Sequence, residues 1–499
     1  MTDLGSWILW STVLVPFFAG VVILLIPGEQ QRAIKGVALV AATLALAASV
    51  YAFAAYDHKA GGLQFIGQID WLDSLGISYH QAIDGLSVPL VLLTGIVLFT
   101  GVFISLNITS RAKDYLVLFL FLVTGVYGVF TVVDTFFFFF FFELAVLPMY
   151  LLIGVWGASS DFKTFIRTKE YGAMKLVLYL VAGSVLVWVA LIAVYAESPV
   201  KTFDLLALKE VTFSHNFQLF FFPFFMVGFG VLAGLWPFHT WSPDGHVAAP
   251  TAVSMIHAGV LMKLGAFGII RVGMELLPAG AEAWMPVLLG LGIINVLYGA
   301  ISALGQTDLK YVVGYSSVSH MGYVLLGMAT LDPLGIAGSV LQMFSHGIMT
   351  ALFFAMVGVV YDRTHIRDIT VLEGLAKRMG ITASYFAVAG LASLGLPGLS
   401  GFVAELLVIL GLFRSGYILL GILGIVGATI TAVYILRLLA KVFFGPVSAR
   451  WERLPDLNRT EGFAGGVLVF FLIAVGVYPF PMIQIISSGV DTLLQRVLG

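Results

Sequence analysis

Long apolar runs follow one another along almost the whole chain, and they constrain its fold more than any other feature. Each run is long enough to cross a hydrocarbon layer about 30 Å thick at about 1.5 Å per residue. Loops are short apart from 57–80, 197–216 and 441–462. We predict an all-α polytopic membrane protein, a single domain over residues 1–499 with about 14 transmembrane helices. The expected spans are 6–26, 36–56, 84–108, 115–133, 136–157, 171–195, 217–236, 251–270, 284–304, 311–330, 334–361, 381–413, 417–440 and 463–485.

Composition excludes several classes of function. Only 10% of residues are charged, whereas soluble proteins carry about 25%. The net charge of −2 argues against a nucleic-acid partner, and the absence of cysteine excludes thiolate-held iron–sulfur clusters and disulfides. No glycine-rich phosphate loop occurs, so nothing supports ATP-driven transport. The N-terminus lacks a basic region before its first apolar run, which predicts a retained span and not a cleaved signal.

Basic residues predict the orientation. Lysine and arginine gather in the loops after odd-numbered spans, for example Arg111, Lys113, Lys163, Arg363 and Arg367, and are scarce on the opposite side. Such loops face the cytoplasm. We therefore expect a multi-pass protein of the cytoplasmic (inner) membrane with both termini on the non-cytoplasmic side.

Two spans contain helix breakers. The run 381–413 is too long for one straight span and is interrupted by LGLPGLSGF at 394–402. Span 7 ends in a similar break, GLWPFHTW at 234–241. Broken helices at corresponding points predict two inverted five-helix repeats, spans 4–8 (residues 110–272) and spans 9–13 (residues 284–445), with discontinuous helices 7 and 12.

A few ionisable residues lie inside these spans, and they are the first candidates for function. Glu143 follows seven phenylalanines, and Glu405 lies two turns beyond the break at 394–402. Lys263 lies about 18 Å into span 8, where a lysine costs about 3 kcal/mol unless it meets water or a partner. Each of the three could instead form a fixed structural contact. Lys175 is near enough to a span end to reach water, and Arg437 is better explained as an interfacial anchor.

Histidines provide a second set of candidates. His320 shares a helix face with Ser316 and, more loosely, with Ser317, and His346 lies in the middle of the next span. Neutral imidazole both donates and accepts hydrogen bonds, as a proton relay requires. Packing roles are the alternative, and haem ligation by this pair has no other support. His257 lies on a different face from Lys263, and its role stays open.

Several segments together resemble the antiporter-like subunits of respiratory complex I, most closely subunit M of the NADH:quinone oxidoreductase. They are GISYHQAIDGLSVPLVLLT (76–94), FELAVLPMYLLIGVWG (142–157), PFHTWSPDGHVAAPTAVSMIHAGVLMKLGAFGIIR (237–271), QTDLKYVVGYSSVSHMGYVLLG (306–327), QMFSHGIMTALFF (342–354), YDRTHIRDI (361–369) and LGLPGLSGFVAELLVILGLF (394–413). The chain also ends soon after span 14, whereas the L-type subunit of that family continues into a long lateral helix.

The resemblance implies a proton-pumping module of the membrane arm. In that family Glu143 would belong to a Glu–Lys pair, while Lys263 and Glu405 would form the onward path, with His320 and His346 on the same hydrophilic axis. The implied partners are N-, L- and K-type subunits within the bilayer. No cofactor is expected on this chain, because NADH or another donor, flavin, iron–sulfur clusters and quinone would act in other subunits.

The sequence departs from the family pattern at one important point. The family places a lysine in span 7, about five residues before the proline matched by Pro237, and this chain has only apolar residues at 231–236. Either Lys175, which we favour, or a nearby histidine replaces it as the partner of Glu143, or the subunit works differently. His257 and the SPDGH motif also suggest a divergent branch, whose electron donor need not be NADH.

These features lead to one main hypothesis and three alternatives. The chain conducts protons through Glu143, Lys175, Lys263, His320, His346 and Glu405, coupled to quinone reduction elsewhere. The alternatives are the related D-type subunit of a multisubunit Na⁺/H⁺ antiporter, a subunit of a membrane-bound hydrogenase or other ferredoxin-linked complex, and a purely structural spacer.

Overall fold

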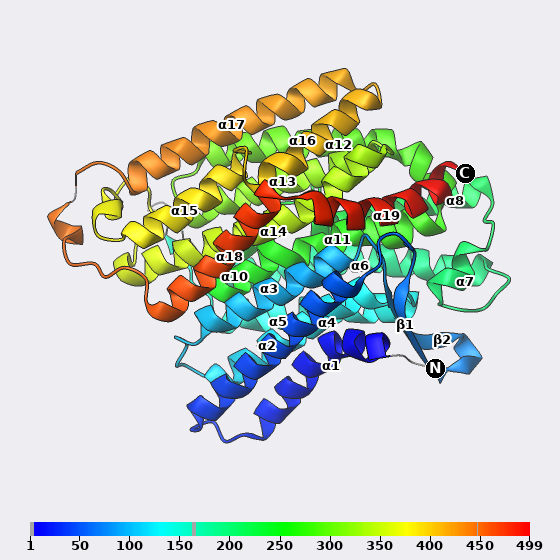
Figure 1. The fold of residues 1–499 in the computed structure, drawn as a ribbon, viewed down its shortest axis with the longest axis horizontal. Helices are drawn as coiled ribbons and strands as arrows, with labels where there is room; N and C mark the ends of the chain where they lie inside the picture. Colours follow the sequence, from blue (N-terminus) through cyan, green and yellow to red (C-terminus); the bar gives the residue numbers. More distant parts are fainter. Residues whose placement is uncertain (1–3, 162–165, 447) are drawn as a thin grey trace.

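The structure is a computed structural model that describes residues 4–161, 166–446 and 448–499. Within these residues, twelve helices are long and apolar enough to cross a membrane, which confirms the predicted helical membrane protein (Figure 1). They are α1 (Leu4–Leu25), α2 (Gln31–Ala55), α3 (Val88–Ser105), α4 (Ala112–Thr131), α5 (Thr135–Trp156), α6 (Lys169–Glu197), α8 (His215–Ala233), the composite helix Thr251–Met274, α12 (Pro278–Gly305), α14 (Pro333–Thr364), α17 (Ile418–Val442) and α18 (Arg459–Val477).

Helices also occupy the two remaining expected spans. The helix α13 (Leu309–Ala329) covers one of them, and α15 (Gly380–Ser393) with α16 (Ser400–Arg414) covers the other. Between α15 and α16 the chain turns at Gly395 and Gly398, which both have positive φ. The predicted break in this span is therefore confirmed.

The predicted break at the end of span 7 is also confirmed. The helix α8 stops at Gly234, which adopts the left-handed conformation that glycine tolerates best. A short helix, α9 (Trp241–Ala248), follows before the composite helix begins at Thr251. The relation between the two broken regions as inverted repeats stays a prediction.

The last expected span, 463–485, is confirmed as the helix α18, but its predicted end is wrong because the helix breaks after Val477. The helix α18 ends at Val477, and α19 (Phe480–Leu498) begins directly after Pro479. Pro479 and Pro481 lack backbone donors, so they suit a helix start but not the interior of a helix. Figure 1 shows α19 running on from α18 toward the end of the molecule that carries both termini.

The long loop 57–80 forms a β-hairpin, which departs from the purely helical prediction. Strands β1 (Gln64–Leu72) and β2 (Ile77–Ile83) pair antiparallel, with Gln68 opposite His80. Gly76 closes the turn at a φ of 64°, and a side chain there would collide with the backbone of Lys201. The smaller elements are β3 (Ser160–Asp161), β4 (Ile166–Arg167), α7 (Leu205–Lys209) and the 3-10 turns Asp73–Leu75, Leu375–Lys377 and Ala449–Trp451.

Asp134 joins this hairpin to the bundle. Its carboxylate caps α5 by accepting the N–H groups of Phe136 and Phe137 at 2.9 and 3.0 Å, and it also accepts the N–H of Ser78 in β2 at 3.1 Å. The residue is fully buried. Burial raises the pKa of Asp134 to about 6, although the three N–H donors act in the opposite direction.

This buried cap predicts a pH-dependent stability. An unfolded aspartate ionises near pH 3.9, so the folded protein binds an additional proton between that pH and about 6. The contribution of Asp134 to stability is therefore present at low pH and is lost as the pH rises through 6, by about 3 kcal/mol in all. Asp134→Asn keeps a capping oxygen and has no carboxylate to ionise. We expect the melting temperature of the variant minus that of the wild type to increase between pH 5 and 7.5, and a constant difference would contradict this.

The core of the bundle is formed by the composite helix Thr251–Met274 and by α14. Both are buried within the protein, whereas α2 and α17 present much of their surface outward. Figure 1 places α10, the first segment of the composite helix, and α14 in the middle of the bundle. Lys263, Arg271 and His346 on these two helices therefore face protein instead of lipid, as ionisable residues in membrane proteins usually do.

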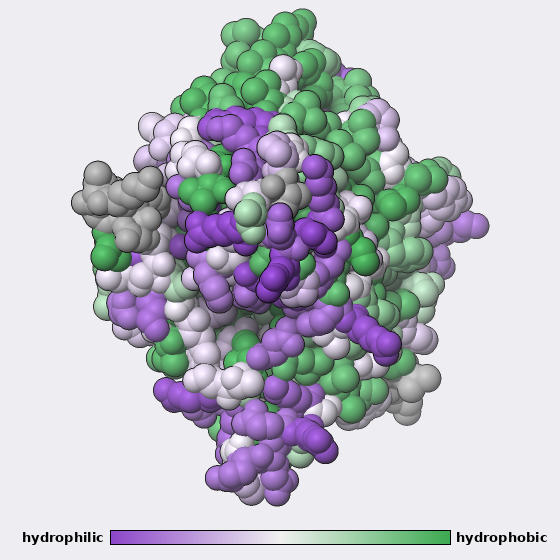
Figure 2. Space-filling view, turned by 90° about the vertical axis from the view of Figure 1, so that its left-hand side faces the viewer, coloured by the Kyte–Doolittle hydropathy of each residue, from purple (hydrophilic) through white to green (hydrophobic). Residues whose placement is uncertain are grey.

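The surface has a polar end and apolar flanks. Figure 2 views the end opposite both termini, where hydrophilic residues gather in the centre and at the bottom of the view and hydrophobic residues dominate the top and much of the right-hand side. Exposed Lys377 and Arg378 belong to the loop between α14 and α15 at this end. Lys163, which we expected in a basic loop, lies outside the described residues.

Candidate functional site

Lys263 is completely buried in the composite helix. It lies in α11 (Met262–Gly268), between the π-helical segments His257–Leu261 and Ile269–Met274. Such segments disturb the regular backbone pairing and are frequent at functional sites. The ammonium Nζ donates to the carbonyl of Ala258, within the first π-helical segment, and lies 2.8 Å from Nδ1 of His346 on α14.

A continuous line of polar side chains leads from Lys263 to Glu405. The rings of His346 and His320 have centroids 5.4 Å apart. The Nδ1 atom of His320, on α13, lies 3.2 Å from Oε1 of Glu405, and its Nε2 lies 2.9 Å from the Ser393 hydroxyl. All four of Lys263, His346, His320 and Glu405 are buried. The sequence predicted each of them, and the structure brings them together.

Glu405 lies against the break between α15 and α16. A side chain on Gly395 would place its Cβ 3.0 Å from Oε2 of Glu405. The positive φ of 74° at this position also favours glycine. The break therefore provides space for the carboxylate, in agreement with the expectation that functional groups gather where a span is interrupted.

Ser316 and Ser317, which share a helix face with His320 in the sequence, do not hydrogen-bond to it. The hydroxyls of Ser316 and Ser317 both donate to the carbonyl of Val313, one turn earlier in their own helix. Serine side chains inside helices commonly bond back in this way. His320 pairs instead with Ser393 and Gln342 on neighbouring helices, and its contacts with protein at both ring nitrogens disfavour haem ligation.

A second cluster surrounds Asp244 in α9. The Asp244 carboxylate is bound by Arg167, lies 2.8 Å from Nζ of Lys175 and accepts the hydroxyl of Tyr311 at 2.8 Å. Sequence reasoning missed Asp244, although it is the only charged residue in the interrupted stretch 234–249. That isolation within a helix break was a usable signal.

Lys175 does not pair with Glu143, so the partnership that we favoured is wrong. Lys175 pairs with Asp244, and Glu143 has no ion pair among the described residues. The Glu143 carboxylate instead meets the hydroxyl of Ser184, and one of its oxygens is buried without a hydrogen-bond partner in the described chain. Ser184 lies nine residues beyond Lys175 in α6, about 13 Å along the axis, which explains why the lysine does not reach Glu143.

Two histidines lie close together in the core beside α9. The rings of His246 and His257 have centroids 4.0 Å apart, and His257 also stacks on Trp241 at 5.3 Å. Nε2 of His246 lies 3.0 Å from the Ser242 hydroxyl. Among the described residues, neither ring nitrogen of His257 has a hydrogen-bond partner. Such an orphan in a protein interior usually indicates an ordered water or a functional role.

Other residues have simpler roles. Arg437 donates to the carbonyl of Leu304 near the polar end of the molecule, in agreement with an anchor. Val231 and Leu232, where the family pattern would place a lysine, are buried and apolar. Lys310 is buried at the start of α13 and donates to the carbonyl of Ala249 at 2.7 Å.

Comparison with known proteins agrees with this geometry. The family model described as NADH:quinone oxidoreductase/Mrp antiporter, TM, matches residues 133–431. NAD(P)H-quinone oxidoreductase chain 4 1 of Synechococcus elongatus is 38% identical over 497 residues, covering 98% of this chain and 92% of that protein. The chain belongs to this family. A chain 4 2 protein of Thermosynechococcus vestitus is 37% identical with the same coverage.

Chains of solved structures share this fold. A chain of respiratory complex I from Thermus thermophilus superposes with a TM-score of 0.89 at 26% identity, covering 99% of this chain and all of that one. A chain of the Mrp complex from Dietzia sp. shares the fold, with a TM-score of 0.87 at 20% identity and complete coverage of both chains. Lys263, His320, His346 and Glu405 all lie within residues 133–431, the region that the family model matches.

Proposed function

We propose that this chain is an M-type membrane-arm subunit of a complex I-type NAD(P)H (or other donor):quinone oxidoreductase and that it translocates protons. The observation that carries the proposal is the buried line Lys263, His346, His320 and Glu405. Nζ of Lys263 lies 2.8 Å from Nδ1 of His346, Nδ1 of His320 lies 3.2 Å from Oε1 of Glu405, and the centroids of the two histidine rings are 5.4 Å apart. Closely spaced ionisable groups in a buried core are what proton transfer requires, and a spacer has no need of them.

The mechanism is electrostatic. In a medium of low dielectric, a charge on Lys263 acts strongly on His346 and His320. When the ammonium gives its proton to His346, the positive charge moves one residue toward Glu405, whose carboxylate stabilises it at His320. Proton movement along the line thus couples the charges of neighbouring residues.

The Asp244 cluster supplies the other end of the path. Asp244 binds Arg167 and Lys175 near the polar end of the molecule, and His246 is its near neighbour in α9. We assign Lys175 to this entrance and not to a pair with Glu143. Glu143 lies outside the continuous line, and Glu143→Gln tests whether its carboxylate takes part.

The membrane arrangement is part of the proposal. We count α13 and the α15–α16 pair as spans, which gives fourteen, and we retain the inverted repeats 110–272 and 284–445. The polar end seen in Figure 2 then faces the cytoplasm, and both termini lie on the non-cytoplasmic side of the cytoplasmic membrane. An even number of alternating spans puts both termini on the same side of the membrane, in agreement with Figure 1, where they lie at the same end of the molecule.

The redox chemistry belongs elsewhere in the assembly. The described residues contain no group of three or more histidines, aspartates and glutamates that could hold a metal. We place NADH or another donor, flavin, iron–sulfur clusters and quinone in partner subunits, and we expect N-, L- and K-type chains beside this one.

A multisubunit Na⁺/H⁺ antiporter is the second candidate, because the Mrp complex shares the fold. A membrane-bound hydrogenase or other ferredoxin-linked complex is a variant of the first candidate. A chain of an archaeal membrane-bound sulfane sulfur reductase shares the fold, with a TM-score of 0.82 at 23% identity. Purification of the assembly with its co-migrating subunits separates these candidates. Flavin and iron–sulfur subunits with quinone-dependent proton uptake would support our proposal, and small antiporter subunits alone would overturn it.

A further inference from the structure

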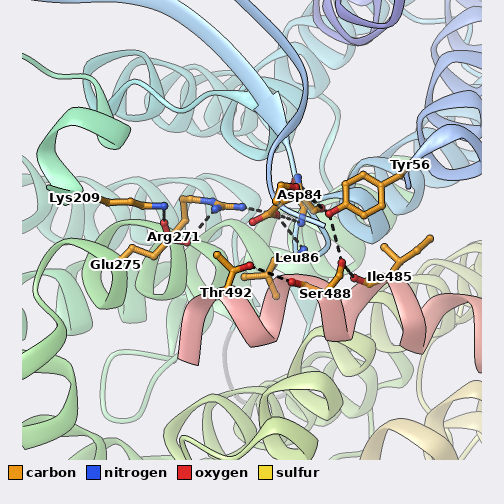
Figure 3. A network of polar contacts seen from close by, with 11 residues as sticks. Tyr56, Asp84, Leu86, Lys209, Arg271, Glu275, Ile485, Ser488 and Thr492 are labelled. Atoms are coloured by element: carbon orange, nitrogen blue, oxygen red, sulfur yellow. Dashed lines mark hydrogen bonds and ion pairs between the residues drawn. The ribbon is translucent and has the colours of Figure 1, made fainter. Parts of the chain in front are cut away.

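The composite helix carries polar groups on both sides of Lys263, and the charges toward its C-terminal end are paired with one another (Figure 3). Arg271 donates to Asp84 at 2.6 Å and to Glu275 at 2.9 Å. Lys209, at the end of α7, forms an ion pair with Glu275. Each of these four charges faces an opposite charge, as buried ions in proteins usually do. A structural role accounts for this network.

The histidines toward the N-terminal end of the composite helix are not paired in this way. His257 is completely buried, and neither of its ring nitrogens has a hydrogen-bond partner among the described residues. The ring of His246 in α9 lies beside it, with centroids 4.0 Å apart, and Nδ1 of His246 also lacks a partner there. Unpaired nitrogens in a protein interior are costly, so this histidine pair, His246 and His257, indicates an ordered water or a functional role.

Gly245 provides the space for the His257 ring. A side chain at this position would place its Cβ 3.1 Å from Cε1 of His257, which is closer than most Cβ contacts in proteins. Gly245 belongs to the SPDGH motif, and both this motif and His257 depart from the family pattern. The structure joins the two departures, because the glycine in α9 admits the imidazole that the composite helix carries.

The His257 ring also lies close to the region where the family pattern places a lysine. It stacks on Trp241 with centroids 5.3 Å apart, and the indole N–H of Trp241 donates to the carbonyl of Val231 at 2.9 Å. Val231 and Leu232 are the buried apolar residues at the position of that lysine. His257 therefore brings an ionisable group to a part of the core that α8 leaves without charge.

Lys263 points toward the end of the helix that carries His257. Its ammonium donates to the carbonyl of Ala258, the residue directly after His257. The charge of Lys263 acts on the rings of both His246 and His257. The same ammonium lies 2.8 Å from Nδ1 of His346 on α14, where the line toward Glu405 begins. Lys263 is therefore the group through which the histidine pair and the line can exchange a proton.

We propose that His257 is a proton-carrying residue of the path and that it loads Lys263. This inference rests on the proposed function and deepens it. After Lys263 has given its proton to His346, its neutral amine accepts a proton from the His257 imidazolium, so that a ring N–H bond breaks and an N–H bond forms at Nζ. An ordered water conducts this proton, because the unpaired ring nitrogens supply the partners that such a water needs. His246 then returns a proton to His257 from the side of the Asp244 cluster.

Proton translocation by the whole complex tests this role. His257→Phe fills the space of the ring but removes both nitrogens, and His257→Gln keeps hydrogen-bonding groups but takes up no proton near neutral pH. We expect both variants to lower the proton uptake per quinone reduced in proteoliposomes as far as Lys263→Met does. A hydrogen bond that only supports the fold would survive in H257Q, so a deficit in that variant identifies proton transfer.

His239→Phe is the matched control. His239 is also buried, with both ring nitrogens unpaired among the described residues, but its ring packs against Tyr298 on α12 at 4.9 Å between centroids. We expect a wild-type stoichiometry in H239F, and an equal deficit there would contradict a specific role of His257.

The outcomes separate this inference from the proposed function. Normal stoichiometry in either variant of His257 beside a defective K263M would overturn the role of His257 and leave the proposed function intact. Normal stoichiometry in K263M would overturn the proposed function itself. If H257F does not assemble, H257Q decides.

Discussion

Lys263→Met lowers the proton-to-electron stoichiometry of the complex while quinone reduction continues and the assembly stays intact. Methionine fills the space of the lysine stem but cannot carry a proton to His346, 2.8 Å away in the wild type. It also removes a buried charge, so the fold should tolerate it. The measurement is proton uptake per quinone reduced in proteoliposomes, with assembly checked on native gels. We expect the loss of every proton that passes through this subunit.

Two further variants make the result specific. Glu405→Gln interrupts the other end of the line and should produce the same deficit. Lys441→Met removes an exposed lysine at the end of α17 and should leave the stoichiometry unchanged. A wild-type stoichiometry in both K263M and E405Q would show that the buried line is structural, which would favour the spacer hypothesis.

Asp244→Asn destabilises the protein strongly, because it removes the carboxylate that Lys175 binds at 2.8 Å. Only 4% of the Asp244 side chain is exposed, and breaking such a buried pair typically costs about 3–5 kcal/mol. The Lys175 side chain is 18% exposed, so solvent recovers part of this and we expect about 3 kcal/mol. The melting temperature of the purified assembly and the amount of assembled complex measure the effect.

A double-mutant cycle identifies the ion pair as the cause. Lys175→Met added to Asp244→Asn removes the ammonium that the first change leaves without its carboxylate. We expect the double variant to be clearly more stable than the sum of the two single effects implies. Additive losses would show that Lys175 and Asp244 do not interact.

Among the described residues, neither ring nitrogen of His257 has a hydrogen-bond partner. This is compatible with the absence of the lysine that the family pattern places in span 7. The apolar Val231 and Leu232 provide no cation for Glu143, and among the described residues no lysine pairs with it instead. His246 in α9 and His257 in the composite helix instead bring two imidazole rings together, with centroids 4.0 Å apart.

The sequence alone determined the class of the protein and most of its central residues. Apolar length predicts spans, because an unpaired backbone cannot cross lipid outside a helix, and Pro397 with its neighbouring glycines predicts a broken one. Charged and imidazole side chains inside an apolar run are energetically costly and usually functional, which is why the sequence already singles out Lys263, His320, His346 and Glu405. These signals are local, so they can be read without the fold.

Only the tertiary structure decided which residues meet. Lys175 pairs with Asp244 and not with Glu143 because of where α9 turns back into the bundle. No spacing in the sequence predicts the position of that turn. The pairing of Asp84 with Arg271 joins residues 187 positions apart. Hydrogen bonds and ion pairs form only when two atoms lie within a few ångströms of each other. Whether distant segments come that close is decided by how the helices pack.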